Sequence, residues 1–227
     1  MELMLDTANL DAIKKGAETL PLSGITTNPS IIKKEGKINY FEHLKAIRKI
    51  IGFDNSLHVQ VVAKDFAGMM ADAEAILSSV DKEVFIKVPV TEAGIKLIRE
   101  LKRQEVNVTA TAIYSNFQAY LAIAAGADYI APYYNRMDNL NIDPARAISE
   151  MAGEISRTHS AAKILAASFK NIGQVNTAIE NGAQSVTIAP EIVTQALMMP
   201  SVLKAVDDFS ADWESVFGEK KDIASLL

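Results

Sequence analysis

Lys87 stands alone inside an apolar run. It interrupts the segment 84–90, VFIKVPV, which is otherwise typical of a buried strand. An unpaired ammonium group in such a place is costly to remove from water. Burial favours the neutral amine, so we expect the pKa of Lys87 to fall. A neutral, positioned amine attacks carbonyl carbon, which is the chemistry of lysines that form Schiff bases. The alternative is a lysine with a buried stem and a head that reaches water at the strand end.

Further polar side chains fall within or just after other short apolar runs. If those runs are parallel strands whose carboxyl ends meet at one face, these side chains form a single site around Lys87. Each also has a plainer interpretation, as a helix cap, a strand-forming threonine, a packing aromatic, a core amide or a surface ion pair. The candidates are Asp6, Thr26, Asn28, Gln60, Thr109, Thr111, Tyr133, Arg136 and Ser168.

The segment 165–171, LAASFKN, runs from a predicted strand into a predicted helix start. Phosphate sites of barrels often lie after strands seven and eight, at a helix N-terminus. Ser168 and nearby backbone donors are candidates to hold phosphate oxygens, and Arg136 on the preceding strand end is a candidate to supply charge bidentately. The alternative is a simple helix cap with Lys170 in water.

The elements that must position these residues alternate regularly. Apolar runs predict strands at 2–6, 23–26, 57–62, 84–88, 106–112, 128–132, 163–167 and 184–188. Helical patterns predict helices at 9–18, 40–50, 66–79, 92–103, 115–125, 143–157, 171–181, 190–197 and 200–216. Asn28-Pro29-Ser30 is a further helix start, with Asn as cap and Pro at the first helical position. Eight such units predict an α/β fold, a closed (β/α)8 TIM barrel in one domain over 1–227. A doubly wound open sheet is the alternative, but no G-x-G-x-x-G marks a dinucleotide crevice.

Composition narrows the function classes. The net charge of −5 argues against nucleic acid or an anionic membrane as partner. There is no cysteine, which excludes a disulfide framework, a thiol nucleophile and a thiolate metal site. The opening MELMLDTANLDAIKKG lacks the basic and apolar regions of a signal peptide, and no apolar run is long enough to span a bilayer. We therefore expect a cytoplasmic protein.

The tail beyond the eighth predicted barrel helix has apolar residues at helical spacing over about 200–217, including Phe209, Trp213 and Phe217. It predicts an extra C-terminal helix. One interpretation is a helix that closes the barrel of its own subunit. The other is an arm that packs on a neighbouring subunit, which would make the protein a homo-oligomer.

Four segments together resemble the transaldolase family: LMLDTAN at 3–9, GITTNPSII at 24–32, VFIKVPVT at 84–91 and LAASFK at 165–170. The resemblance covers essentially the whole chain, and this set of motifs is highly specific. It implies a (β/α)8 barrel that uses neither a metal nor an organic cofactor. It also implies a Schiff-base lysine on the fourth strand, at Lys87.

Within the family, small members are similar either to fructose-6-phosphate aldolases or to short transaldolases. Gln60 and Tyr133 match the aldolase-like pattern, where transaldolases usually have glutamate and phenylalanine. The stretch Thr109-Ala110-Thr111 mixes features of the two subgroups. Small members also resemble ring-stacked decamers in which the C-terminal helix reaches a neighbouring subunit, and the aromatic tail fits that arrangement.

The resemblance therefore implies a class I aldolase that cleaves fructose 6-phosphate reversibly to dihydroxyacetone and glyceraldehyde 3-phosphate. Its substrates would be sugar phosphates and small ketones or aldehydes. The expected roles are a nucleophile at Lys87, a general base at Asp6 and a water-positioning group of Gln60, Thr111 and Tyr133. Substrate binding is expected of Thr26, Asn28, Thr109, Arg136 and Ser168.

Three alternatives remain. A transaldolase would transfer the dihydroxyacetone unit between sugar phosphates. A sugar-phosphate-binding scaffold would keep the pocket without turnover, although Lys87, Asp6 and Tyr133 are all present. An isomerase-type phosphate barrel would need a glutamate or histidine base at a strand end, and only His58 is near one.

Overall fold

The computed structural model describes residues 1–227. They divide into two compact units, Met1–Pro190 and Glu191–Leu227. The prediction that residues 1–227 form one domain stays a prediction.

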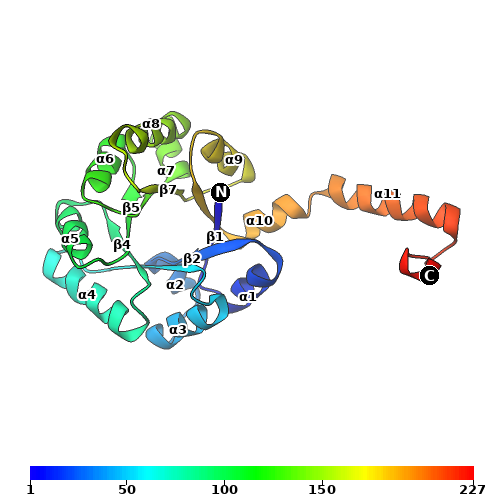
Figure 1. The fold of residues 1–227 in the computed structure, drawn as a ribbon, viewed down its shortest axis with the longest axis horizontal. Helices are drawn as coiled ribbons and strands as arrows, with labels where there is room; N and C mark the ends of the chain where they lie inside the picture. Colours follow the sequence, from blue (N-terminus) through cyan, green and yellow to red (C-terminus); the bar gives the residue numbers. More distant parts are fainter. The chain divides into compact units, whose positions relative to one another are not determined.

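Eight parallel strands close into a barrel in the first unit, and each strand pairs with its neighbours in chain order. Strand β1 completes the ring by pairing with β8. Figure 1 shows the strands on the inside of this unit and the helices around them. The predicted (β/α)8 barrel is confirmed and the doubly wound sheet is wrong. No predicted strand boundary differs from the observed one by more than two residues. The strands are β1 (Glu2–Asp6), β2 (Leu22–Thr26), β3 (Ser56–Gln60), β4 (Phe85–Pro89), β5 (Val108–Ile113), β6 (Tyr129–Pro132), β7 (Lys163–Ala166) and β8 (Ser185–Ile188).

The helices of this unit follow the predicted ranges closely, and one short helix, α7, is added. Helix α2 begins where Asn28-Pro29 predicts a start, whereas α7 was not predicted because six residues are too few for a helical period to show. The helices are α1 (Leu10–Thr19), α2 (Pro29–Lys34), α3 (Tyr40–Ile51), α4 (Phe66–Ser79), α5 (Glu92–Arg103), α6 (Asn116–Ala124), α7 (Tyr134–Asn139), α8 (Pro144–Thr158) and α9 (Ile172–Glu180).

The end of β4 is fixed by a close approach of helix α5. A Cβ atom at Gly94 would lie 1.9 Å from the carbonyl oxygen of Pro89, so only glycine fits there. Thr91 caps the same helix by accepting a hydrogen bond from the Gly94 N–H at 3.0 Å. Ile86 and Val88 are fully buried. Because side chains alternate along a strand, Lys87 between them lies on the opposite face of β4.

A layer of aromatic side chains fills the barrel at the level of residues 58, 85 and 129. The ring of His58 stacks on Phe85 with 4.6 Å between ring centroids and meets Tyr129 edge-on at 5.3 Å. Phe85 also packs against a buried cluster of Met4, Tyr129 and Leu165. Packed side chains therefore fill the barrel interior below the carboxyl ends of the strands, where Lys87 and Gln60 lie, and leave no open channel there.

The second unit contains most of α10 (Pro190–Leu197), then α11 (Pro200–Phe217) and a short 3₁₀ turn, η1 (Ala224–Leu226). The predicted extra C-terminal helix is confirmed. Within this unit no residue of α11 is buried. Phe209 is 70% exposed, and the rings of Trp213 and Phe217 lie 4.2 Å apart. None of the helices in the chain combines the length and the apolar character that crossing a bilayer would require.

Candidate active site

A pocket of about 300 Å³ lies at the carboxyl ends of the barrel strands. This is the end at which barrels of this architecture carry their functional residues. Seven of the ten predicted site residues line it, so the structure brings together groups from six strand ends. The lining residues are Asp6, Asn28, Pro29, Ser30, Gln60, Lys87, Ala112, Tyr114, Tyr133, Arg136, Ala167 and Ser168.

Lys87 projects from β4 into this pocket and is only 4% exposed. Its Nζ donates a hydrogen bond to the carbonyl oxygen of Thr27 at 2.9 Å. Burial lowers the pKa of the Lys87 ammonium below its usual value, and the charge of Asp6 opposes that shift. The neutral amine is therefore more accessible near neutral pH than in an ordinary lysine, which is what attack on a carbonyl carbon requires.

Asp6 ends strand β1 beside the lysine. Thr26 Oγ1 donates to Asp6 Oδ1 at 2.6 Å, and the hydroxyls of Thr26 and Thr187 share a hydrogen bond of 2.7 Å. Burial raises the pKa of the Asp6 carboxyl, while the positive charge of Lys87 and the hydrogen bond from Thr26 act in the opposite direction. A carboxylate with a raised pKa is better suited to accept a proton than an ordinary aspartate is.

The hydroxyl groups of Thr111 and Tyr133 form a hydrogen-bonded pair 3.0 Å apart. Burial raises the pKa of the Tyr133 phenol, and the bond to Thr111 partly offsets that effect. Gln60 pairs with Lys87 in the β3–β4 ladder, and its Oε1 is buried with no hydrogen-bond partner. A buried amide oxygen without a partner is costly, so Gln60 is ready to accept a hydrogen bond from a ligand or a water.

Arg136, on α7, and Ser168, after β7, line the pocket on the β6–β7 side. The guanidinium group lies 5.0 Å above the Tyr133 ring, and Nη1 donates to the Tyr114 hydroxyl at 2.8 Å. Ser168 has a φ angle of 64°, which is uncommon for a residue other than glycine. Lys170 is exposed and does not line the pocket, and its N–H donates to Gln174 Oε1 at 2.8 Å.

Three predicted site residues lie outside the pocket wall. Thr26 and Thr111 contact it through Asp6 and Tyr133, as described above. Thr109 is fully buried, and its hydroxyl is 2.7 Å from Nδ1 of His58. The roles predicted for all ten residues stay predictions, and the Thr109 hydroxyl is engaged by His58 beneath the site.

His58 is occupied by structural contacts. Its Nε2 lies 2.8 Å from Ser56 Oγ, and its Nδ1 bonds Thr109. Burial lowers the pKa of the His58 imidazole well below its usual value, so the ring is neutral near pH 7. A neutral ring with both nitrogens engaged is not positioned as the strand-end base that an isomerase-type reaction would need.

Sequence patterns missed Tyr114, which lines the pocket, and Thr187, which lies just behind it. Tyr114 lies just beyond β5 and contacts both Arg136 and, edge-on at 5.6 Å, the ring of Tyr133. Thr187 lies within β8 and reaches Asp6 through Thr26. The only signal in the sequence was their position near strand ends, which they share with many residues that have no such contact.

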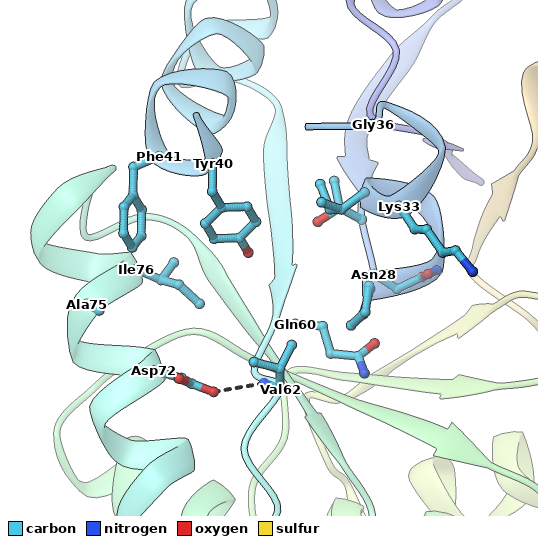
Figure 2. Close-up of a pocket in the computed structure, with 13 residues that line it drawn as sticks. Asn28, Lys33, Gly36, Tyr40, Phe41, Gln60, Val62, Asp72, Ala75 and Ile76 are labelled. Carbon is cyan, nitrogen blue, oxygen red and sulfur yellow. Dashed lines mark hydrogen bonds between the residues drawn. The ribbon is translucent and has the colours of Figure 1, made fainter. Parts of the chain in front are cut away.

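A second cavity of about 410 Å³ adjoins the site and shares Asn28, Pro29 and Gln60 with it. Figure 2 shows Tyr40, at the start of α3, across this space from Asn28, with Phe41 beside it near Ile76. Below them, Asp72 accepts a hydrogen bond from the Val62 N–H at 2.8 Å (Figure 2). The wall is mainly apolar, so Gln60 stands between a polar pocket and an apolar one. Sequence patterns did not predict this cavity because α2, α3 and α4 form it jointly.

The fold and the pocket define a (β/α)8 barrel with a buried amine beside a carboxylate in its mouth, an arrangement suited to chemistry at carbonyl carbon. No three His, Asp or Glu side chains lie together in a way that could hold a metal ion. The prediction of a reaction without metal or organic cofactor stays a prediction.

A family model described as Transaldolase/Fructose-6-phosphate aldolase matches residues 3–225. A curated protein of Streptococcus pneumoniae (strain ATCC 700669 / Spain 23F-1), named probable fructose-6-phosphate aldolase, is 55% identical over 213 residues. That alignment covers 94% of this chain and 96% of the relative. The chain therefore belongs to the transaldolase/fructose-6-phosphate aldolase family, as the four motifs predict.

Proposed function

We propose that this protein is a class I aldolase that cleaves fructose 6-phosphate reversibly to dihydroxyacetone and glyceraldehyde 3-phosphate. The observation that carries the proposal is the desolvated Lys87 amine beside Asp6, in a pocket whose β6–β7 side holds Arg136. The name of the Streptococcus pneumoniae relative, probable fructose-6-phosphate aldolase, supports the choice of reaction within the family.

The first half of the reaction forms and uses an imine. The neutral Lys87 amine attacks the ketone carbon of the sugar, and loss of water leaves a cationic iminium. Asp6 removes the proton of the hydroxyl on the fourth carbon, and the bond between the third and fourth carbons breaks. Its electron pair moves into the iminium to give a neutral enamine, while the fourth carbon leaves as the aldehyde of glyceraldehyde 3-phosphate.

The second half releases the three-carbon fragment. The enamine takes a proton at the former third carbon of the sugar, which regenerates the iminium. Water then adds to the iminium carbon, the former ketone carbon, and displaces the Lys87 amine. A neutral amide cannot act as a base, so Gln60 would hold the water through its unpartnered Oε1. The hydrogen-bonded hydroxyls of Thr111 and Tyr133 would relay the proton. Asn28 and Ser168, which line the pocket, would bind the hydroxyls of the substrate. The substrate-binding roles predicted for Thr26 and Thr109 would have to be exerted through their neighbours Asp6 and His58, because neither threonine lines the pocket.

Arg136 would bind the phosphate. We expect Arg136→Met to raise KM for fructose 6-phosphate by about 10- to 100-fold, because a charge-assisted hydrogen bond contributes about 1.5–3 kcal/mol. In the synthetic direction KM for glyceraldehyde 3-phosphate should rise likewise, while that for glyceraldehyde without phosphate stays within about twofold. Steady-state kinetics with both aldehydes measures this. Arg146→Met, at a 77% exposed arginine, is the matched control. An equal change for both aldehydes would contradict the assignment.

The family description also names transaldolases, and the two activities differ in the fate of the enamine. A transaldolase keeps it for a second aldose phosphate, whereas an aldolase hydrolyses the imine. We expect Gln60→Glu to raise the ratio of transfer to dihydroxyacetone release several-fold. The reason is that the change removes the amide that is proposed to hold the hydrolytic water. The ratio is measured with and without an aldose phosphate acceptor. Gln104→Glu, at an exposed site, is the control, and an unchanged ratio would remove Gln60 from this role.

The protein is proposed to act in the cytoplasm as a homo-oligomer, a decamer by the family resemblance, with neither nucleic acid nor membrane as partner. The exposed apolar residues of α11, among them Val202, Phe209 and Val216, support self-association. The net charge of −5 supports the absence of polyanionic partners. Light scattering of the purified chain measures the number of subunits, and a monomer at all concentrations would exclude the oligomer.

The reaction itself is tested by borohydride reduction in the presence of fructose 6-phosphate, followed by mass spectrometry and an assay for dihydroxyacetone. A reduced three-carbon adduct on Lys87 together with free dihydroxyacetone is the expected result. An adduct without release, until an aldose phosphate is added, identifies a transaldolase. The absence of any adduct would exclude both activities and leave the sugar-phosphate-binding scaffold.

A further inference from the structure

The Lys87 amine is held by a backbone carbonyl, that of Thr27, and Thr27 is itself held by two hydrogen bonds. Lys87 Nζ donates to the Thr27 carbonyl oxygen at 2.9 Å. Thr27 is 1% exposed and does not line the pocket of Lys87 and Asp6. Its backbone N–H and its hydroxyl both donate to one acceptor, the carbonyl oxygen of His58, at 2.9 and 3.1 Å. Thr27, the residue whose carbonyl contacts the amine, is therefore tied twice to strand β3.

That strand is held rigidly on its other side. The His58 ring is fully buried, bonded at both nitrogens to Ser56 and Thr109, and stacked on Phe85. The next residue after Thr27, Asn28, caps α2 by accepting from the Ile31 N–H at 3.0 Å. The orientation of the Thr27 carbonyl is thus set between a fixed strand and a capped helix, and the Thr27 hydroxyl is the side-chain group that bonds this segment to the strand.

This carbonyl has a consequence for the imine. A neutral amine has two N–H bonds, but an iminium nitrogen that carries the lysine chain and a double bond to carbon has one. If that N–H keeps its bond to Thr27, rotation about the Cε–Nζ bond is arrested. The plane of the iminium is then set, and so is the face that it turns toward Asp6. A carbonyl dipole aimed at the N–H also favours the cationic form, which is the form that accepts electrons.

We propose that Thr27 is a positioning residue for Lys87: by bonding the His58 carbonyl, its hydroxyl holds the Thr27 backbone, and with it the carbonyl oxygen that orients first the amine and then the iminium N–H. The inference rests on the proposed Schiff-base function and deepens it. Thr27 acts through its backbone and through Lys87, so removal of its hydroxyl should slow covalent steps more than it weakens substrate binding.

The experiment compares Thr27→Val, which removes the hydroxyl and keeps the shape, with Thr27→Ser, which keeps the hydroxyl. For Thr27→Val we expect kcat and the rate of borohydride-trapped adduct formation to fall by about three- to tenfold, the usual size for one lost hydrogen bond. KM for fructose 6-phosphate should stay within about twofold. Thr27→Ser should recover at least half of the lost rate. Thr19→Val is the matched control, since that exposed hydroxyl donates to the Lys15 carbonyl at 2.7 Å, away from the site.

A purely structural role would give another pattern. Thr27→Val would then lower Tm with unchanged kcat and trapping rate, or Thr27→Ser would be as slow as Thr27→Val, and either result overturns the proposal. If Thr27→Val does not fold, Thr27→Ala replaces it in the same comparison with Thr27→Ser. Wild-type protein is trapped in parallel: if it forms no adduct, the proposed function fails and this inference falls with it, whereas a normal wild-type adduct makes the comparison a test of Thr27 alone.

Discussion

Lys87→Met is expected to abolish borohydride trapping and to lower turnover of fructose 6-phosphate by more than about 10⁴-fold, the scale on which loss of a nucleophile acts. No other lysine lines the pocket, so no second amine within it can take over the attack. Methionine fills nearly the same volume and carries no charge, which suits a site that is 4% exposed. The measurement is kcat together with the mass of the protein after reduction with substrate.

The folded state should survive this change. Removing a desolvated amine relieves a cost of burial, whereas the Thr27 carbonyl loses its partner, and each effect is on the order of 1–3 kcal/mol. We therefore expect Tm to stay within a few degrees of wild type. Lys14→Met, at a lysine whose side chain is 57% exposed, is the control and should retain full activity. A three-carbon adduct that persists in Lys87→Met would place the nucleophile elsewhere.

Asp6→Asn is expected to lower kcat for cleavage by about 10²- to 10⁴-fold, the range for loss of a general base. The asparagine can still accept the hydrogen bond from Thr26, so the change removes basicity with little change of shape. It also removes the negative charge that raises the pKa of Lys87. That pKa should fall further, so the amine stays neutral and the lost rate cannot be attributed to a protonated lysine.

The pH profile separates the two groups. Burial raises the pKa of Asp6, and at a pH below that pKa the carboxyl is protonated and cannot act as a base. At a pH below the pKa of Lys87 the amine is an ammonium ion and cannot attack. Activity should therefore fall on the acid side as each group gains a proton, and the contribution of Asp6 to that fall should disappear in Asp6→Asn. Asp11→Asn, at a 94% exposed carboxylate, is the control. Cleavage at the wild-type rate in Asp6→Asn would show that another group takes the proton.

The order of the elements could be predicted from the sequence because each depends on local patterns. The predicted strand boundaries lie within two residues of the observed ones. The reason is that Val, Ile and Leu cluster in runs that end at polar residues or glycine. The short helix α7 was missed because it has no side-chain cap and only six residues. The burial of Lys87 could also be predicted from its neighbours in the chain. A single charged residue in an apolar strand is expected to be desolvated, whichever residues it contacts in the fold.

What the sequence determined by itself is the architecture and the family, and it singled out Lys87 as the predicted nucleophile, since each follows from the type and spacing of residues near one another in the chain. Only the tertiary structure decided which partner each group has. Thr27 meets Lys87 across 60 residues, Tyr114 meets Arg136 from another strand end, and Thr109 bonds His58 rather than lining the pocket. The physical reason is that hydrogen bonds and desolvation depend on distances of a few ångströms between strands, and the closed ring of strands sets those distances while local sequence does not.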